Sequence, residues 1–545
     1  MASVFEKPSV ERLVTGGTYI LFFGLLAGAV GWLFIVVASR SDIGVGPELL
    51  GYITTANALG GIGVCISGGL HQGLSKYLSE ALVESKEKAL LYAKAGFVIF
   101  NTIGVIIFTI FIGVSIYMFQ TRFEYGILFG SMAFIFLLGF FRDNFVGNFA
   151  SIHRFDYIGK FSLIAAVANS SLAYLILFLV PKPLNAYLLP LTLGLGPIIQ
   201  IILLIYYGKK VLAYSPFSVL RGARRSEITQ IFKYGLYCII PNIVFSGAIL
   251  WIQNLWYSGF FNFATPEAYI VSINGLIIGY ASIVFAICNF GWPQIPAVAE
   301  AKAMNNSKLI DDYMKNTLHT GFNITAFFLL IYVGLSYQIL FLFHGPEYVV
   351  GHIPFVLLSI AVAVLGIEFL ICTLLIGLGE GRKAAYLIAT LTVTQIILVP
   401  LLIITLNSNF GADSTLYAGP ASLLISSLAI FPLVFHYMVK YTKNPPRTYR
   451  NILGKGMISI ILTLLIYSIL ELTILTNLNP IIGLIIRGAL LFGFFMFFLL
   501  LFGGFSDADL DFYEHFLGPL KRIVPSLRWL LHHSPFYEPE EKPSA

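Results

Sequence analysis

Apolar stretches long enough to cross a membrane follow one another along almost the whole chain of 545 residues. Hydrophobic residues make up 58% of the sequence and charged residues only 11%, whereas soluble domains carry about 25% charged residues. A span needs about 20 apolar residues to cross a hydrocarbon core about 30 Å thick. Gly, Pro and charged residues divide the chain into about 14 such stretches. The sequence therefore predicts an all-α polytopic membrane protein with about 14 transmembrane helices.

The distribution of positive charge predicts how the chain is oriented. Of the 33 Lys and Arg residues, 28 fall on the side of the membrane that holds both termini. The other five lie on the opposite side (Arg40, Arg122 and Lys182) or within spans (Arg142 and Arg487). Because an excess of Lys and Arg marks cytoplasmic loops, both termini are expected in the cytoplasm. These loops account for the net charge of +6, and no nucleic-acid partner is expected.

No metal ion or organic cofactor is expected. All four Cys residues lie within apolar stretches, without a CxxC pair or a His at zinc spacing. The sequence also lacks the GxxxxGK[ST] loop that cradles nucleotide phosphates, since the glycine run 377–382 has neither the Lys nor the hydroxyl residue. Coupling to H⁺ or Na⁺ is the form of energy input that stays open.

The chain contains an internal repeat. Residues 52–59 (YITTANAL) match residues 269–276 (YIVSINGL), with five of the eight positions identical or Thr/Ser. Glu80-Ala81 recurs as Glu300-Ala301. Six predicted spans separate the two copies, so both copies insert in the same orientation. This predicts two six-helix lobes related by a pseudo-twofold axis along the membrane normal, with the substrate between them.

The spans and the repeat divide the chain into five parts. These are an N-terminal six-helix lobe (1–208), a basic cytoplasmic linker (209–230), a C-terminal six-helix lobe (231–440), an appended two-helix hairpin (441–503) and a cytoplasmic interfacial tail (504–545). In the hairpin, Glu471 and Arg487 fall close to the outer ends of the last two spans and are expected to pair.

Several motifs resemble those of a known family. Residues 38–40 (Ala-Ser-Arg) followed by 46–52 (Gly-Pro-Glu-Leu-Leu-Gly-Tyr) are similar to the first outer loop of polysaccharide-type flippases. Residues 68–80 resemble the second span of that family, and 293–300 are a looser match to its eighth span. The chain thus resembles the polysaccharide transport family (O-antigen-type lipid-linked oligosaccharide flippases) of the multidrug/oligosaccharidyl-lipid/polysaccharide exporter (MOP) superfamily. The resemblance covers residues 10–440.

The resemblance implies a function. It implies alternating access that carries a polyprenyl- or dolichyl-(pyro)phosphate-linked oligosaccharide from the inner to the outer leaflet, for cell-surface polysaccharide or glycoprotein assembly. The expected location is the plasma membrane of a prokaryote, and the expected partners are the lipid-linked oligosaccharide, membrane lipids and glycan-assembly enzymes.

Two alternatives stay open. An ion-coupled small-molecule or drug antiporter of the same superfamily would have the same hydropathy. A membrane glycosyltransferase or polymerase would need catalytic carboxylates on a sizeable outer loop, but the predicted outer loops are short and carry single acids. No enzymatic activity is therefore expected.

Arg142 is the leading candidate for substrate binding, because it lies near mid-bilayer in the fourth predicted span. Ionisable groups within spans are functional candidates, and the guanidinium fork suits a diphosphate. The alternative is that Arg142 pairs with a carboxylate of another span or snorkels, with Asp143 neutralising it locally. Direct pairing with Asp143 is expected to be awkward, since adjacent helical residues point about 100° apart. Asp143 and the deep Glu368 are candidates for a coupling H⁺ or Na⁺, although a structural hydrogen bond explains Glu368 equally well.

Amide and aromatic side chains form a second group of candidates. Asn57 and Asn274 occupy equivalent repeat positions, and Gln253, Asn254 and Trp256 lie together in the seventh span, next to Trp251. They could line a sugar-binding cavity, or the amides could simply hydrogen-bond neighbouring helices.

Two further basic residues complete the candidate set. His71 lies near the cytoplasmic end of the second span, where it could bind headgroup sugars or pack as a core residue. Arg40 follows the first span, where it could receive headgroups or merely encode topology.

Overall fold

The computed structural model describes residues 10–40, 43–212, 218, 222–245, 248–261, 267–284, 288–442, 446–473, 479–504, 510 and 524–534. Every ordered element within these ranges is helical, which confirms the all-α prediction. Much of the predicted tail (504–545) and part of the predicted linker (209–230) lie outside the described residues. The division of the chain into five parts stays a prediction.

The elements of residues 10–211, called the first half below, form one group. They are α1 Val10–Ser39, α2 Gly46–Glu84, α3 Lys86–Thr121, α4 Phe123–Ser151, α5 Phe155–Leu179, α6 Leu184–Leu188, the 3₁₀ helix η2 Leu189–Gly194 and α7 Leu195–Val211.

Residues 225–441, called the second half, form another group, and the remaining helices follow it. They are α8 Arg225–Phe245, α9 Ala248–Phe260, α10 Ala268–Val284, α11 Cys288–Ala303, α12 Ser307–His344, η5 Pro346–Gly351, α13 His352–Gly377, α14 Gly381–Phe410, η6 Ala412–Tyr417, α15 Ala418–Tyr441, α16 Pro446–Thr473, α17 Pro480–Leu501 and α19 Val524–His532.

The number of spans agrees with the prediction of about 14 transmembrane helices. Among the described residues, 12 helices are long and apolar enough to cross a membrane. The α8–α9 pair, bent by 67°, provides a 13th candidate span. α10 is shorter, and it occupies the predicted eighth span together with α11. The chain is thus a multi-pass membrane protein.

Polar residues mark where several helices begin. The side chains of Ser85, Asn306 and Asn479 accept hydrogen bonds from backbone N–H groups in the first turns of α3, α12 and α17. These N–H groups have no partner within their own helix, so each cap stabilises the helix start. Pro480 follows the last cap, at a position where its missing N–H is not needed.

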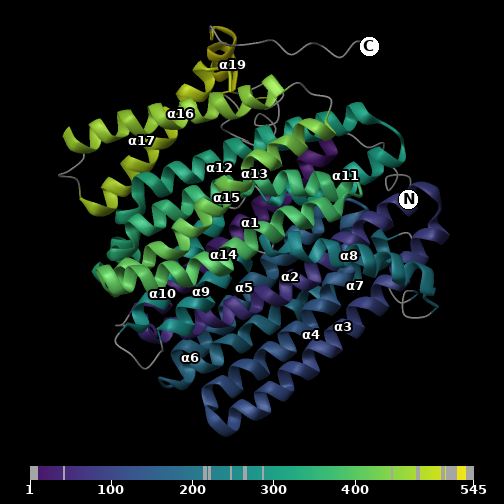
Figure 1. The fold of residues 1–545 in the computed structure, drawn as a ribbon, viewed down its shortest axis with the longest axis horizontal. Coiled ribbons are helices and arrows are strands. Elements are labelled where there is room, and N and C mark those ends of the chain that lie inside the picture. The colour runs from purple at the N-terminus through teal and green to yellow at the C-terminus, as the bar shows by residue number, and fades with distance from the viewer. Residues whose placement is uncertain are drawn as a thin grey trace.

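The two halves meet along α2, which packs against α8, α9, α10 and α11. Figure 1 shows α3, α4, α6 and α7 on one side of the bundle and α12–α15 on the other. Glycines allow close contact: a Cβ at Gly69 would lie 2.4 Å from the Cα of Ile239, and one at Gly73 would lie 3.1 Å from the Cα of Gly235. Lys76 and Lys302 mark the nearby end of the bundle, called the basic end below.

The last two membrane helices lie at the edge of the bundle against α12 (Figure 1). Arg487 of α17 donates from Nε and Nη2 to the two carboxylate oxygens of Glu471 of α16, both at 2.8 Å. Tyr467 also donates to Glu471, at 3.2 Å. The predicted pairing of Glu471 with Arg487 is confirmed, and it joins the two helices of the hairpin.

Candidate substrate cavity

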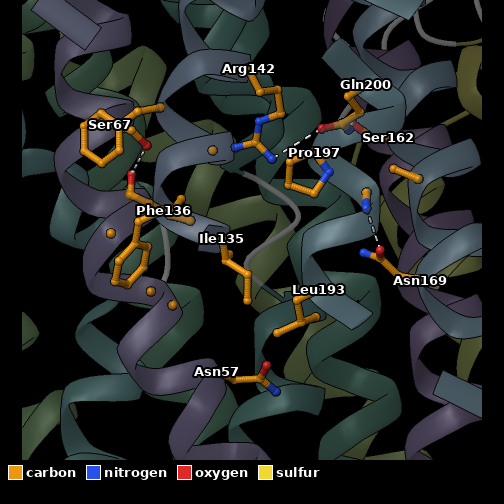
Figure 2. Close-up of a pocket in the computed structure, with 18 of the residues that line it drawn as sticks. Asn57, Ser67, Ile135, Phe136, Arg142, Ser162, Asn169, Leu193, Pro197 and Gln200 are labelled. Atoms are coloured by element: carbon orange, nitrogen blue, oxygen red, sulfur yellow. Dashed lines mark hydrogen bonds between the residues drawn. The ribbon is translucent and has the colours of Figure 1, made fainter. Parts of the chain in front are cut away.

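A cavity of about 520 Å³ lies between α2, α4, α5 and α7 of the first half. Trp251 of α9 adds to its lining from the second half. Figure 2 shows Arg142 at one end of this cavity and Asn57 at the other. The polar side chains of the lining are Asn57, Ser67, Arg142, Ser162, Asn169 and Gln200.

Arg142 is held by a short network. Its Nε donates to Asp143 Oδ1 at 2.7 Å, and its Nη2 lies 2.6 Å from the same oxygen. Its Nη1 donates to Gln200 Oε1 at 3.3 Å, and Gln200 donates to Ser162 at 3.1 Å (Figure 2). The expectation that Asp143 would pair awkwardly with Arg142 is therefore wrong. The long arginine side chain can fold back over the neighbouring residue, and low polarity favours neutralisation by the nearest carboxylate.

His71 belongs to the same region. A smaller cavity of about 160 Å³ adjoins the first one and shares Arg142 and Gln200 with it. His71 of α2, Asp143 of α4 and Asn242 of α8 also line this smaller cavity. The structure thus brings together three of the predicted site residues, His71, Arg142 and Asp143, from two helices that are far apart in sequence.

Three of the amide candidates lie elsewhere. Gln253, Asn254 and Asn274 are fully buried, and they are not part of the lining of the two cavities that contain Arg142 or of a further cavity between the halves. Asn274 donates to Asn254 at 3.0 Å, and Asn254 donates to Thr54 of α2 at 3.3 Å. Of the two roles that the sequence left open, these hydrogen bonds match the second, in which amides join neighbouring helices.

The other amide and aromatic candidates differ in whether they line a cavity. Gln253 donates to Gln395 of α14 at 3.3 Å. Trp256 packs on Phe260 of its own helix, with ring centroids 6.4 Å apart, and is not part of the cavity linings. Asn57 and Trp251, by contrast, do line the cavity.

Arg40 and Glu368 lie away from the Arg142 cavity. Arg40 is exposed directly after α1, at the end of the bundle opposite the basic end. Glu368 of α13 is fully buried, and Ser427 of α15 is the polar side chain beside its carboxyl. A carboxyl buried this deeply is costly when charged, so a proton or a cation would stabilise it.

A third cavity, of about 420 Å³, lies between the two halves. It is formed by α1, α2, α9 and α10, and it shares Asn57 and Trp251 with the Arg142 cavity. Trp32 and Tyr280 provide aromatic faces in its lining. The Arg142 cavity and the space between the halves are therefore neighbours on either side of Trp251.

A hydrogen-bonded chain joins the halves at the end opposite the basic end. Ser39 of α1 lies 2.7 Å from Nδ1 of His344 in α12, and Nε2 of His344 lies 2.8 Å from the hydroxyl of Tyr280. Trp32 donates to the same hydroxyl at 2.6 Å. Buried polar groups are costly unless paired, so this chain of hydrogen bonds holds α1, α10 and α12 together.

Sequence reasoning missed the polar residues that surround Arg142. Ser162, Asn169 and Gln200 line the main cavity, and Asn242 lines the smaller one. The signal that could have found them is their occurrence inside apolar spans, where amides require partners. Which of them face a cavity depends on the rotation of each helix, which the sequence does not give.

No protein-family model and no curated protein match this sequence. Solved structures do match. A multidrug resistance MATE family transporter of the MOP superfamily in its outward-facing conformation gives a TM-score of 0.61 at 14% identity, covering 81% of this chain and 100% of that one. The inward-facing conformation of such a transporter gives 0.56 at 14% identity, covering 80% and 99%. This chain has the fold of a MATE transporter.

Another structure with the MATE fold extends this comparison. A MOP superfamily transporter from Pyrococcus furiosus, described as having a binding pocket of reversed polarity, matches with a TM-score of 0.60 at 13% identity, covering 81% of this chain and 100% of that one. At such identities the likeness concerns the fold alone. Because the fold is known in outward- and inward-facing conformations, it is a fold of alternating access.

Proposed function

We propose that the protein is a flippase that moves a polyprenyl- or dolichyl-(pyro)phosphate-linked oligosaccharide from the inner to the outer leaflet by alternating access. The observation that carries this proposal is Arg142, a permanent cation that faces a cavity of about 520 Å³ within the membrane. The loop motifs that resemble polysaccharide flippases support the same substrate class. The end that carries most of the basic residues is the proposed cytoplasmic end, where the headgroup enters.

The chemistry of the cavity supports an anionic headgroup. With Nε and Nη2 turned toward Asp143 and Nη1 toward Gln200, the guanidinium still has N–H groups that can donate to phosphate oxygens. Gln200, Ser162 and Asn169 add amide and hydroxyl groups of the kind that bind sugars. A volume of about 520 Å³ is within the range of small-molecule sites, so a longer oligosaccharide would extend past Trp251 into the cavity between the halves.

Ion coupling is part of the proposal. A phosphate on Arg142 would compete with Asp143, and a carboxylate released into this poorly polar environment would favour uptake of a proton or a cation. His71 lines the smaller cavity together with Asp143 and could share that proton. Glu368, fully buried and with no basic side chain among the groups that act on its carboxyl in the described structure, is a second coupling candidate. The substrate partner is the lipid-linked oligosaccharide, with glycan-assembly enzymes acting before and after it.

A drug antiporter is the second candidate function. The observation in its favour is that the MATE structures reported above are multidrug transporters. In addition, much of the Arg142 cavity is lined by apolar side chains such as Ile135, Phe136 and Leu193. Against it, the carboxylate of Asp143 in the adjoining cavity is already paired with Arg142, so it is not free to attract a cationic drug.

The test is leaflet exchange of a fluorescent lipid-linked oligosaccharide in liposomes that contain the purified protein. Arg142→Ala should slow exchange at low substrate by about 10- to 100-fold, the equivalent of one or two lost charge-assisted hydrogen bonds. Arg142→Lys should recover part of the rate, since the charge returns without the fork. The matched control is Arg122→Ala, which removes an exposed arginine at the start of the same helix.

Three outcomes decide between the functions. Slow exchange in Arg142→Ala with normal exchange in Arg122→Ala supports phosphate anchoring. Equal exchange in both variants removes Arg142 from the mechanism. If the wild-type protein moves no lipid-linked oligosaccharide but exchanges a small dye against H⁺ or Na⁺, the antiporter is the correct function.

A further inference from the structure

The turns that follow α4 and α13 have the same backbone structure. After α4, the N–H of His153 bonds to the carbonyl of Ala150 at 2.9 Å, and the N–H of Arg154 bonds to that of Phe149 at 3.0 Å. After α13, Gly379 and Glu380 make the same pair of bonds at 2.9 and 2.7 Å. Both turns are therefore Schellman motifs, which require a left-handed residue just beyond the helix.

The left-handed residue differs between the two turns. Gly379 has a φ of +82°, which glycine adopts without strain. His153 has a φ of +56° at the corresponding position. A left-handed conformation is unfavourable for a residue with a side chain, so a histidine at this position calls for a compensating contact.

The imidazole of His153 provides that contact. Its Nε2 lies 3.1 Å from Oε2 of Glu300 on α11, in the second half. The side chain of His153 is 4% exposed and that of Glu300 is 17% exposed. A pair this well shielded is screened less by water and salt than a surface ion pair.

The internal repeat shows that this contact is specific to one copy. Glu80 of α2 corresponds to Glu300, but Glu80 pairs with Lys76 of its own helix at 2.9 Å. In the repeat, Gly379 corresponds to His153, so the turn at Gly379 is the one that would face Glu80. Gly379 has no side chain that could reach a carboxylate. Lys76 instead lies beside Gly379, with its Cε 3.6 Å from where a Cβ would be. Only the His153 turn, of these two, therefore carries an ionisable side chain across to the other half.

We infer that His153 and Glu300 form a latch that holds the basic end of the protein closed and parts when that end opens. The fold alternates between two facing conformations, so contacts between the halves at one end must break in one of them. The latch adds to the α2–α8 glycine contact, which also closes this end. Its role does not depend on which substrate is carried.

A cysteine buried behind the latch can report opening. Ser75 of α2 is 2% exposed and lines a small cavity that also includes Ile295 of α11. In full-length protein in nanodiscs, with the four native cysteines replaced by alanine, Ser75→Cys should react with a water-soluble maleimide when the basic end opens. If closing is faster than modification, the rate measures the open fraction.

The variants separate the latch from general damage. His153→Gly suits the backbone of the turn and removes the imidazole, and Glu300→Gln removes the charge. Each should speed labelling by about tenfold, the effect of losing one charge-assisted contact. The double variant should be no faster than the single ones, because both changes break the same contact. Asp156→Asn is the control, since it removes the negative charge from the 2.9 Å pair with Arg154 next to this turn without crossing to the other half.

The remaining outcomes overturn the inference. These are labelling at the wild-type rate in both single variants, acceleration in only one of them, additive acceleration in the double variant, or equal acceleration in Asp156→Asn. The result is independent of the leaflet-exchange assay, so failure of the latch and failure of the proposed substrate can be told apart.

Discussion

Gly69 lies where the backbones of α2 and α8 touch, and Gly69→Ala tests whether that contact sustains the closed basic end. The new Cβ would lie 2.4 Å from the Cα of Ile239 and 2.5 Å from its N. No side-chain rotation can relieve a contact with backbone, so the two helices must move apart by about 1 Å. Overpacking of this kind costs about 1–3 kcal/mol.

Gly60→Ala is the matched control, because a Cβ at Gly60 of the same helix meets nothing within 4 Å. Both variants gain the helix propensity of alanine, about 1 kcal/mol, so the difference between them isolates the packing cost. Thermal unfolding in detergent can be followed with a thiol-reactive dye, since Cys65, Cys238 and Cys372 are buried.

Gly69→Ala should melt a few degrees below Gly60→Ala, since 1 kcal/mol corresponds to roughly 2–4 °C in domains of 150–250 residues. It should also label faster at Ser75→Cys, because separation of α2 from α8 opens the basic end. A Gly69→Ala protein as stable as Gly60→Ala would refute the close approach of the two helices.

Two further substitutions test buried polar contacts. Glu471→Gln leaves Arg487 without its carboxylate and should destabilise the protein by about 2 kcal/mol, less than the loss of a fully buried pair because Glu471 is 29% exposed. The Glu471→Leu, Arg487→Met double variant should recover much of the loss in the same thermal assay. Tyr257→Phe removes a hydroxyl that donates to Thr415 O at 2.5 Å and accepts from Gly419 N at 3.1 Å, so it should lower stability by about 1–3 kcal/mol. Unchanged melting of Tyr257→Phe would mean that water replaces the hydroxyl.

Hydropathy and spacing predicted the features that depend on depth along a helix. The approximate number of spans and the Glu471–Arg487 pair needed nothing more than position along the sequence. The rotation of each helix about its axis was not predictable in the same way. Nearly all-apolar helices carry little amphipathic signal, so Asn57 and Asn274, equivalent in the repeat, could not be separated: Asn57 faces a cavity, whereas Asn274 bonds to Asn254.

Contacts that depend on how far a side chain extends could not be predicted from the sequence either. The pairing of Arg142 with Asp143 depends on a long side chain folding back along its own helix, which residue spacing alone does not reveal. The contact between His153 and Glu300 joins residues far apart in sequence, so it requires the packing of the two halves. The sequence could place both residues at helix ends on the same side of the membrane, but not at bonding distance.

The internal repeat links Arg142 and Glu368. Arg142 precedes the left-handed residue His153 by the same number of positions as Glu368 precedes Gly379, so the two residues occupy corresponding places on α4 and α13. One copy carries a permanent cation that faces a cavity, and the other carries a fully buried carboxyl. A permanent cation suits an anionic headgroup, whereas a carboxyl can be neutralised by a proton or a cation. Opposite chemistry at equivalent positions is what a transporter needs if one half holds the substrate while the other responds to the coupling ion.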